Sequence, residues 1–174
     1  MKPLIIVIVL FIPILSMTVI GVEDDMQKLE VKLGFDRIPM ENTCEGKNIS
    51  PQIGLSGLNA TSVAVIVDDP DASGGTFTHW LIWNIKPASI IPAGIPKSPS
   101  LSEPIKAVQG LNDFRKIGYM GPCPPPGKSH RYFFRVYGLD KKLDIKPGST
   151  RHDLENAIQG HILQQGEALA IFSR

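Results

Sequence analysis

Strand-like segments that follow one another without a helix of adequate length constrain the fold of this chain most strongly. Residues 63–67 form a continuous apolar run rich in valine, which is typical of a strand buried on both faces. Residues 79–85 and 132–137 are aromatic and β-branched and contain no glycine or proline. Near the start, residues 29–33 alternate between apolar and charged side chains, as in a strand with one solvent-exposed face. The pattern predicts a mainly β sandwich rather than a βαβ fold, in which helices separate the strands.

One helix is predicted near the C-terminus. Thr150 and Asp153 have the spacing of a capping box, and apolar residues recur at helical spacing as far as Ile162. We expect the helix to stop at Gly166, because glycine is a common residue just after a helix end. The alternation in residues 167–172 then predicts a closing strand.

Proline dominates the stretch between residues 85 and 132. Residues 87–104 contain five prolines, each of which fixes φ and lacks an amide donor, so we expect an irregular connection there. The chain has 16 glycines and 15 prolines among 174 residues, which indicates many turns without low complexity. This length favours a single domain.

The first 22 residues differ from the rest of the chain. Residues 3–22 carry no charge and are rich in leucine, isoleucine and valine, and they lie between Lys2 and an acidic cluster. This is the pattern of a secretory signal peptide, although no A-x-A cleavage site is present. About 20 apolar residues also suffice to span a bilayer, so an uncleaved anchor is the main alternative and a buried helix is a third. We expect residues 1–22 to be a signal peptide or anchor, residues 23–28 a linker, and residues 29–174 the folded, extracytoplasmic domain.

The charges of the chain nearly balance. Lysine and arginine number 18 and aspartate and glutamate 17, so the net charge is +1. Such a chain has no strong positive field to attract nucleic acid, and we expect no nucleic-acid partner.

The two cysteines, Cys44 and Cys123, both lie in the exported part among turn residues. In an oxidising compartment they can form a disulfide, and the alternative is a pair of buried free thiols. Two cysteines are too few for a structural zinc site, and we expect no cofactor.

Residues whose side chains can bind a ligand or react are concentrated in two segments. Residues 68–72 read DDPDA, follow the buried strand and lead to His79. Residues 121–127 read GPCPPPG and lead to His130 and Tyr132 at the start of another strand. Polyproline makes a rigid wall, and we expect the flanking glycines to let the backbone approach a ligand and to leave amide donors available for an anion.

These two segments closely resemble the signature regions of the phosphatidylethanolamine-binding protein family, in its bacterial and archaeal Raf-kinase-inhibitor-like branch. The resemblance covers about residues 29–174 and includes TCEG at 43–46, NISP at 48–51, GY at 118–119 and GH at 160–161. As a joint pattern these strings are highly specific, whereas each alone would be weak. Ser73 and Leu55 depart from the family, which commonly has proline and tryptophan at these positions.

The resemblance implies a sandwich of two antiparallel sheets with peripheral helices and a small surface pocket for phosphate-like anions. Two histidines can donate N–H bonds to an anion, and adjacent carboxylates orient the rings while repelling a second negative charge. By position, the residues implied for the pocket are Asp69, Asp71, His79, Gly121 and His130, with Pro122, Pro124 and Tyr132 shaping its wall.

The function that we expect is non-enzymatic binding of a phosphorylated head group or another small anion, with a regulatory role. The chain contains no Gly-x-Ser-x-Gly elbow, His-Glu-x-x-His pair or Walker glycine loop. An exported inhibitor of a peptidase or other partner enzyme is the alternative, because the family includes inhibitors of kinases and peptidases. A metal-assisted hydrolase that uses Asp69, Asp71, His79 and His130 is less favoured, since the spacing matches no metal motif. Exposed aromatic residues and the resemblance also permit a homodimer.

Overall fold

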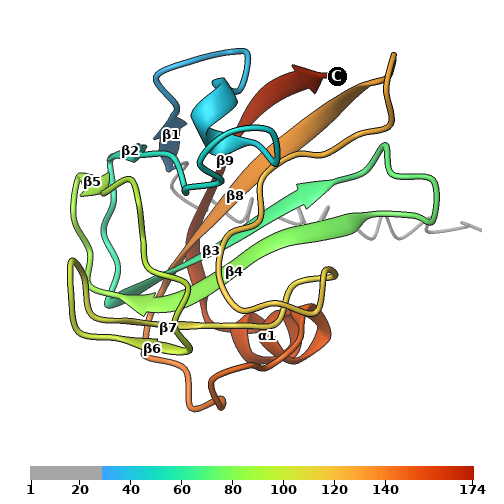
Figure 1. Cartoon of the computed structure of the whole chain (residues 1–174). Helices are drawn as coiled ribbons and strands as arrows, with labels where there is room; N and C mark the ends of the chain where they lie inside the picture. Colours follow the sequence, from blue (N-terminus) through green and yellow to red (C-terminus); the bar gives the residue numbers. More distant parts are fainter. Residues whose placement is uncertain (1–28) are drawn as a thin grey trace, which may run out of the picture.

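Two antiparallel sheets and one α-helix make up the part of the chain that the computed structural model describes, residues 29–174 (Figure 1). The predicted signal peptide or anchor and the linker lie outside these residues. No helix within residues 29–174 is long and apolar enough to cross a membrane.

The larger sheet contains the centre of the fold. Its six strands pair antiparallel in the order β6-β7-β4-β3-β8-β9. Their bounds are Ser62–Asp69 for β3, Phe77–Ile85 for β4, Ser100–Leu101 for β6, Ala107–Gln109 for β7, Ser129–Leu139 for β8 and Ile162–Ser173 for β9. Every residue of β3 is buried, which confirms the strand predicted from the apolar run at residues 63–67.

The smaller sheet covers one face of the larger one. It consists of β1 (Glu30–Lys32), β2 (Ile53–Ser56) and β5 (Ile90–Ile91). A 3₁₀ turn, η1 (Met40–Asn42), lies between β1 and β2. The core between the sheets includes Val65, Trp80 and Phe134, which are inaccessible to solvent.

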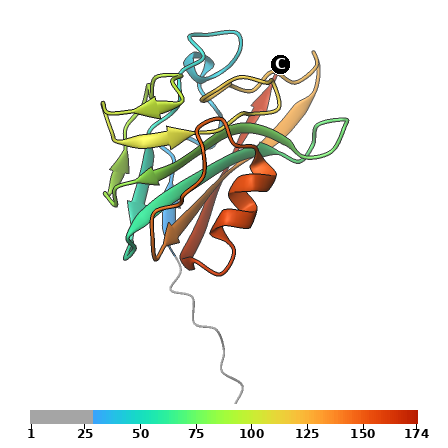
Figure 2. The same cartoon turned by 90° about the horizontal axis from the view of Figure 1, so that it is seen from below.

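Helix α1 (Arg151–Ile158) covers the opposite face of the larger sheet (Figure 2). Its Leu154 and Ile158 pack in a second core with Ala64 and Ile66 of β3. Alternate residues of β3 therefore point into two different cores. This explains why the strand is apolar from residue 63 to residue 67.

Helix α1 begins as predicted but ends earlier. The side chain of Thr150 accepts a hydrogen bond from the amide of Asp153, and the Asp153 carboxylate accepts one from the amide of Thr150. The helix ends at Ile158 because Gly160 adopts a φ of +77°, the left-handed conformation that closes many helices. Ile162 is already the first residue of β9, so its helical spacing is coincidental.

The prediction that Gly166 stops a helix is wrong, because Gly166 lies inside β9, paired with Val136. A Cβ at this position would collide with the carbonyl of Leu29 and lie 2.9 Å from Cγ2 of Val31. Glycine is needed here because the first strand passes close to β9, a long-range contact that leaves no local pattern. The closing strand predicted over residues 167–172 is the second half of this longer strand.

The proline-rich stretch contains more regular structure than predicted. The strands β5 and β6 lie within residues 87–104, and β7 follows shortly after them. Each has only two or three residues, which is too short to show the alternation that identifies a strand in a sequence. The sequence does not predict β2 either, because its four residues are also too few to show a clear alternation.

Candidate functional site

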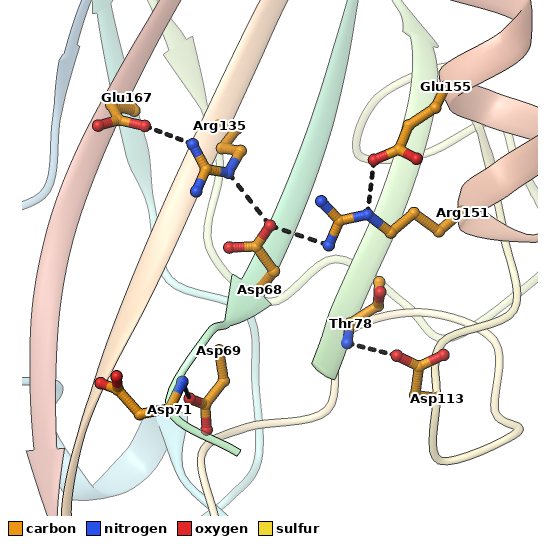
Figure 3. Close-up of polar contacts among 9 residues, drawn as sticks. All are labelled: Asp68, Asp69, Asp71, Thr78, Asp113, Arg135, Arg151, Glu155 and Glu167. Atoms are coloured by element: carbon orange, nitrogen blue, oxygen red, sulfur yellow. Dashed lines mark hydrogen bonds and ion pairs between the residues drawn. The ribbon is translucent and has the colours of Figure 1, made fainter. Parts of the chain in front are cut away.

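The end of β3 sends neighbouring carboxylates to opposite faces of the larger sheet. Successive side chains of a strand alternate, so Asp68 lies on the side of α1 and Asp69 on the other side. Figure 3 shows Asp68 beside two arginines and Asp69 beside Asp71, in the turn that follows the strand. The β3–β4 turn and the start of β8 lie at the same end of the sheet, because β3 pairs with both strands (Figure 1).

Asp69 contacts a histidine from the neighbouring strand. Its Oδ2 lies 2.7 Å from Nδ1 of His130, and the two side chains are only 5% and 12% exposed. The other oxygen, Oδ1, accepts a hydrogen bond of 2.8 Å from the amide of Asp71. Both carboxylate oxygens are therefore engaged, and no hydrogen bond within residues 29–174 engages Nε2 of His130.

Asp71 forms a paired contact with Arg131. The guanidinium donates through Nε at 3.0 Å and through Nη2 at 2.7 Å, and the amide of Arg131 donates at 2.9 Å. These hydrogen bonds stabilise the charged carboxylate and lower the pKa of Asp71 to about 2. Arg131 thus fixes the position of the Asp71 side chain, which borders the site.

His79 lies deeper in the site than His130. Its Nδ1 is 2.6 Å from the carbonyl oxygen of Met120. Its ring packs edge-on against Phe77, Phe114 and Tyr132, with ring centroids 5.3–5.4 Å apart. Burial lowers the pKa of His79 despite the hydrogen bond to Met120 and the nearby carboxylates, so the ring favours its neutral form.

These side chains border one cavity of about 700 Å³. The residues implied by the resemblance that line this cavity are Asp69, Asp71, His79, Pro124 and His130. Three others, Gly121, Pro122 and Tyr132, are not among the lining residues. The lining is completed by Ala72, Ser73, Phe77, Phe114, Cys123, Pro125, Lys128 and Ser129.

Sequence reasoning missed two kinds of lining residue. Lys128 is the only lysine of the lining. Its position between the polyproline segment and His130 could have indicated that it belongs to the site. Phe114 comes from the loop after β7, and its contact with Phe77 at 4.8 Å depends on tertiary folding alone. No local pattern could have indicated it.

The expectation that the glycines of the second segment leave free amides for an anion is wrong. The amide of Gly121 donates to the side-chain oxygen of Asn48 at 2.8 Å, and the amide of Gly127 donates to the carbonyl of Arg174 at 2.6 Å. A Cβ on Gly121 would lie 2.8 Å from Cα of Thr43 and would collide with the carbonyl of Asn42. Gly121 thus serves close backbone packing.

Tyr132 supports the site from behind. Its side chain is buried and its ring packs against His79. Within residues 29–174 its hydroxyl has no hydrogen-bond partner. Burial raises the pKa of Tyr132, and the negative charge of Asp69 raises it further. The hydroxyl is therefore neutral and remains a potential donor.

A disulfide between Cys44 and Cys123 fixes the polyproline wall, with the two Cα atoms 5.5 Å apart. The amide of Cys44 also donates to the carbonyl of Pro122 at 3.1 Å. These two links attach the second segment to the loop after η1.

Asp68 belongs to a separate network on the α1 side of the sheet (Figure 3). Its Oδ2 contacts Nε of Arg135 at 3.1 Å and Nη1 of Arg151 at 2.9 Å. Arg135 also pairs with Glu167 of β9, and Arg151 pairs with Glu155 one helical turn later. Of the three carboxylates that follow the buried run, Asp68 therefore has a structural role and takes no part in the cavity.

No group of three or more histidine, cysteine, aspartate or glutamate side chains within residues 29–174 is arranged to hold a metal ion. The carboxylates considered for a metal-assisted hydrolase bond to His130 and Arg131 instead.

Fold and site together define an antiparallel β-sandwich with a charged pocket at one end of its larger sheet. The chain belongs to the phosphatidylethanolamine-binding protein family, whose model matches residues 31–173.

The relatives support this assignment over nearly the whole chain. The chain is 47% identical to UPF0098 protein PH1269 of Pyrococcus horikoshii, with 100% of this chain and 91% of the relative covered. The crystal structure of the phosphatidylethanolamine-binding protein homologue CT736 of Chlamydia trachomatis is 33% identical, with a TM-score of 0.75 and coverage of 84% and 98%. That of E. coli YbcL, described as a member of the mammalian family, is 28% identical, with a TM-score of 0.76 and coverage of 84% and 99%.

Proposed function

We propose that this protein is a non-enzymatic, regulatory binding protein whose pocket takes small phosphate-like anions, including phosphorylated head groups. The observation that carries the proposal is the pairing of two oriented histidines in one cavity. His79 is held by the carbonyl of Met120 and His130 by Asp69, and both rings border the same space as Lys128. Such groups recognise an oxyanion by directed hydrogen bonds and one positive charge.

The arrangement of the lining hydroxyls supports binding rather than catalysis. A hydrolase of the serine type needs a hydroxyl hydrogen-bonded to a general base. In the described part of the chain, Ser129 bonds to the hydroxyl of Ser173 at 2.9 Å, and neither lining serine bonds to a histidine. Neither serine of the lining is therefore activated as a nucleophile by a histidine.

The proposal includes an extracytoplasmic location. Its support is the N-terminal pattern of Lys2, twenty uncharged residues and an acidic boundary. The disulfide gives weaker support for this location, because intracellular proteins of hyperthermophiles also contain disulfides. Protease treatment of intact cells tests this location. We expect the protease to degrade an exported domain and to leave a cytoplasmic marker protein, the control, intact.

Calorimetric titration of the full chain with inorganic phosphate and with phosphoethanolamine tests the binding proposal. We expect saturable binding that a His79→Ala/His130→Ala double variant weakens by about tenfold or more, because two directed hydrogen bonds are lost. The matched control is His161→Ala, whose ring lies outside the cavity and contacts Asp140. A thermal melt of each variant verifies folding. Absence of binding by the folded wild-type chain would refute the proposal.

A further inference from the structure

Two Asn-x-Ser/Thr triplets occur in the chain, at residues 48–50 and 59–61. This triplet is the acceptor sequence for N-linked glycosylation of exported proteins. The asparagine amide receives the sugar, and the transferase recognises the hydroxyl two residues later. A folded chain is therefore an acceptor only where both side chains are accessible.

The side chains of the first triplet are engaged in the fold. Oδ1 of Asn48 accepts a hydrogen bond of 2.8 Å from the amide of Gly121, and its Nδ2 donates to Sδ of Met120 at 3.7 Å. Ser50 is inaccessible to solvent, and its hydroxyl accepts a hydrogen bond of 2.9 Å from the amide of Ile95. A transferase could reach this hydroxyl only if the loop unfolded, so the native chain does not present the first triplet.

The second triplet is exposed in the connection between β2 and β3. Exposure alternates along it, because Asn59 and Thr61 face solvent while Ala60 is half-buried near Gly138 of β8. Residues two positions apart in an extended segment point to the same side. Within residues 29–174, no hydrogen bond engages the side chain of Asn59 or of Thr61. The amide nitrogen and the hydroxyl that a transferase needs are thus free together.

The backbone of this connection is held against the larger sheet. The amide of Asn59 donates to Oε1 of Gln164 at 2.5 Å, and the Nε2 group of Gln164 donates to the carbonyl of Gly57 at 2.8 Å. The amide of Thr61 donates to the carbonyl of Leu139 at 2.7 Å. The second triplet is therefore part of the native surface, with only its side chains left unbound.

The second triplet and the pocket lie at opposite ends of β3. Thr61 directly precedes the first residue of β3, whereas Asp69 is its last residue and borders the pocket. Figure 1 shows the β2–β3 connection at the end of β3 far from the β3–β4 turn. Eight residues at roughly 3.4 Å each put roughly 25 Å between the two ends. A sugar attached to the second triplet therefore leaves the pocket open.

We infer that Asn59 is an N-glycosylation site of this protein and that Asn48 is not one. This inference rests on the proposed extracytoplasmic location. In the reaction, Nδ2 of Asn59 passes a proton to a base of the transferase and attacks the anomeric carbon of a lipid-linked oligosaccharide. A C–N bond forms, the bond between that carbon and the phosphate oxygen of the lipid carrier breaks, and the lipid phosphate leaves with the electron pair.

A transferase assay on the folded full chain tests the inference. The unmodified chain is incubated with a lipid-linked oligosaccharide and an oligosaccharyltransferase that modifies a synthetic peptide of residues 56–64. Peptide mass mapping then locates the sugar. We expect one glycan per chain, at Asn59, and none at Asn48. Thr61→Ala keeps the asparagine but removes the hydroxyl and should abolish the modification, whereas the matched control Thr61→Ser should retain it.

Production in a host that glycosylates its exported proteins provides a second measurement. Cell fractionation separates exported from cytoplasmic chains, and peptide mass mapping of the exported chains should find the sugar at Asn59.

The outcomes separate this inference from the proposed location. Three results would overturn the inference alone: a sugar on Asn48, exported chains without a sugar on Asn59, or a folded chain that the transferase leaves unmodified although it modifies the peptide. Chains that all stay in the cytoplasm would overturn the proposed location and the inference with it.

Discussion

At the scale of the residue, His79 should make folding stability depend on pH. Burial lowers the pKa of His79 in the folded chain. Below about pH 6.5 the unfolded chain therefore binds a proton at this residue that the folded chain does not bind. The free energy of unfolding should therefore decrease as pH falls below 6.5, by at most about 1.4 kcal/mol per pH unit. Chemical denaturation between pH 5 and 7 should show this slope in the wild type and a smaller one in His79→Gln. Parallel curves for the two proteins would contradict the prediction, and His152→Gln on the exposed helix surface is the control.

Gly121 is constrained by space rather than by ligand binding. Alanine there would place Cβ 2.8 Å from Cα of Thr43 and 2.9 Å from the carbonyl carbon of Asn42, both backbone atoms that cannot rotate away. We expect Gly121→Ala to lower the free energy of unfolding by roughly 1–3 kcal/mol, as measured by denaturant titration. Gly74→Ala is the matched control, because nothing lies within 4 Å of a Cβ there, and its effect should stay within about 0.5 kcal/mol. Equal effects of the two substitutions would show that the close approach is not limiting.

At the scale of the element, Arg151 attaches helix α1 to the end of β3. Its guanidinium contacts Asp68, whose side chain is only 1% exposed (Figure 3). Arg151→Met should cost about 3 kcal/mol, because it leaves a buried carboxylate with Arg135 as its remaining positive partner. Denaturant titration measures this loss.

A second substitution distinguishes lost charge pairing from lost packing of the arginine stem. Asp68→Asn in the Arg151→Met background removes the poorly compensated charge and should recover part of the stability. Lys146→Met, on the exposed segment before the helix, is the control and should change stability by at most about 0.5 kcal/mol. No recovery in the double variant would assign the effect to packing.

At the scale of the whole molecule, the disulfide joins two segments that are far apart in the sequence. It closes a loop of 79 residues between Cys44 and Cys123, and chain entropy predicts a stabilisation of about 4 kcal/mol for such a loop. A Cys44→Ala/Cys123→Ala variant should have a free energy of unfolding lower by about this amount, and should therefore unfold at a lower denaturant concentration. It should also bind phosphate more weakly, since Cys123 lines the cavity. Reductant should lower the stability of the wild type and leave the variant unchanged, and a wild type insensitive to reductant would contradict the prediction.

Local patterns in the sequence determined the central strands and the start of the helix. The apolar run of β3 and the capping box of Thr150 and Asp153 are visible because their causes act between residues at most a few positions apart. The family resemblance brought the histidines and carboxylates of the two segments together, and five of the residues that it implies line one cavity. Whether they bind an anion stays a prediction.

Tertiary structure alone decided what each polar group in the site does. Nδ1 of His79 meets a carbonyl 41 positions away, Nδ1 of His130 meets a carboxylate 61 positions away, and the amide of Gly121 meets Asn48, 73 positions away. Gly166 likewise is explained only by Leu29 at the other end of the described chain. Hydrogen-bond periodicity and side-chain alternation are local and leave a pattern in the sequence. The choice of donor, acceptor or backbone contact is made when distant segments pack, because each buried polar group must then find its partner among whatever residues the fold brings near.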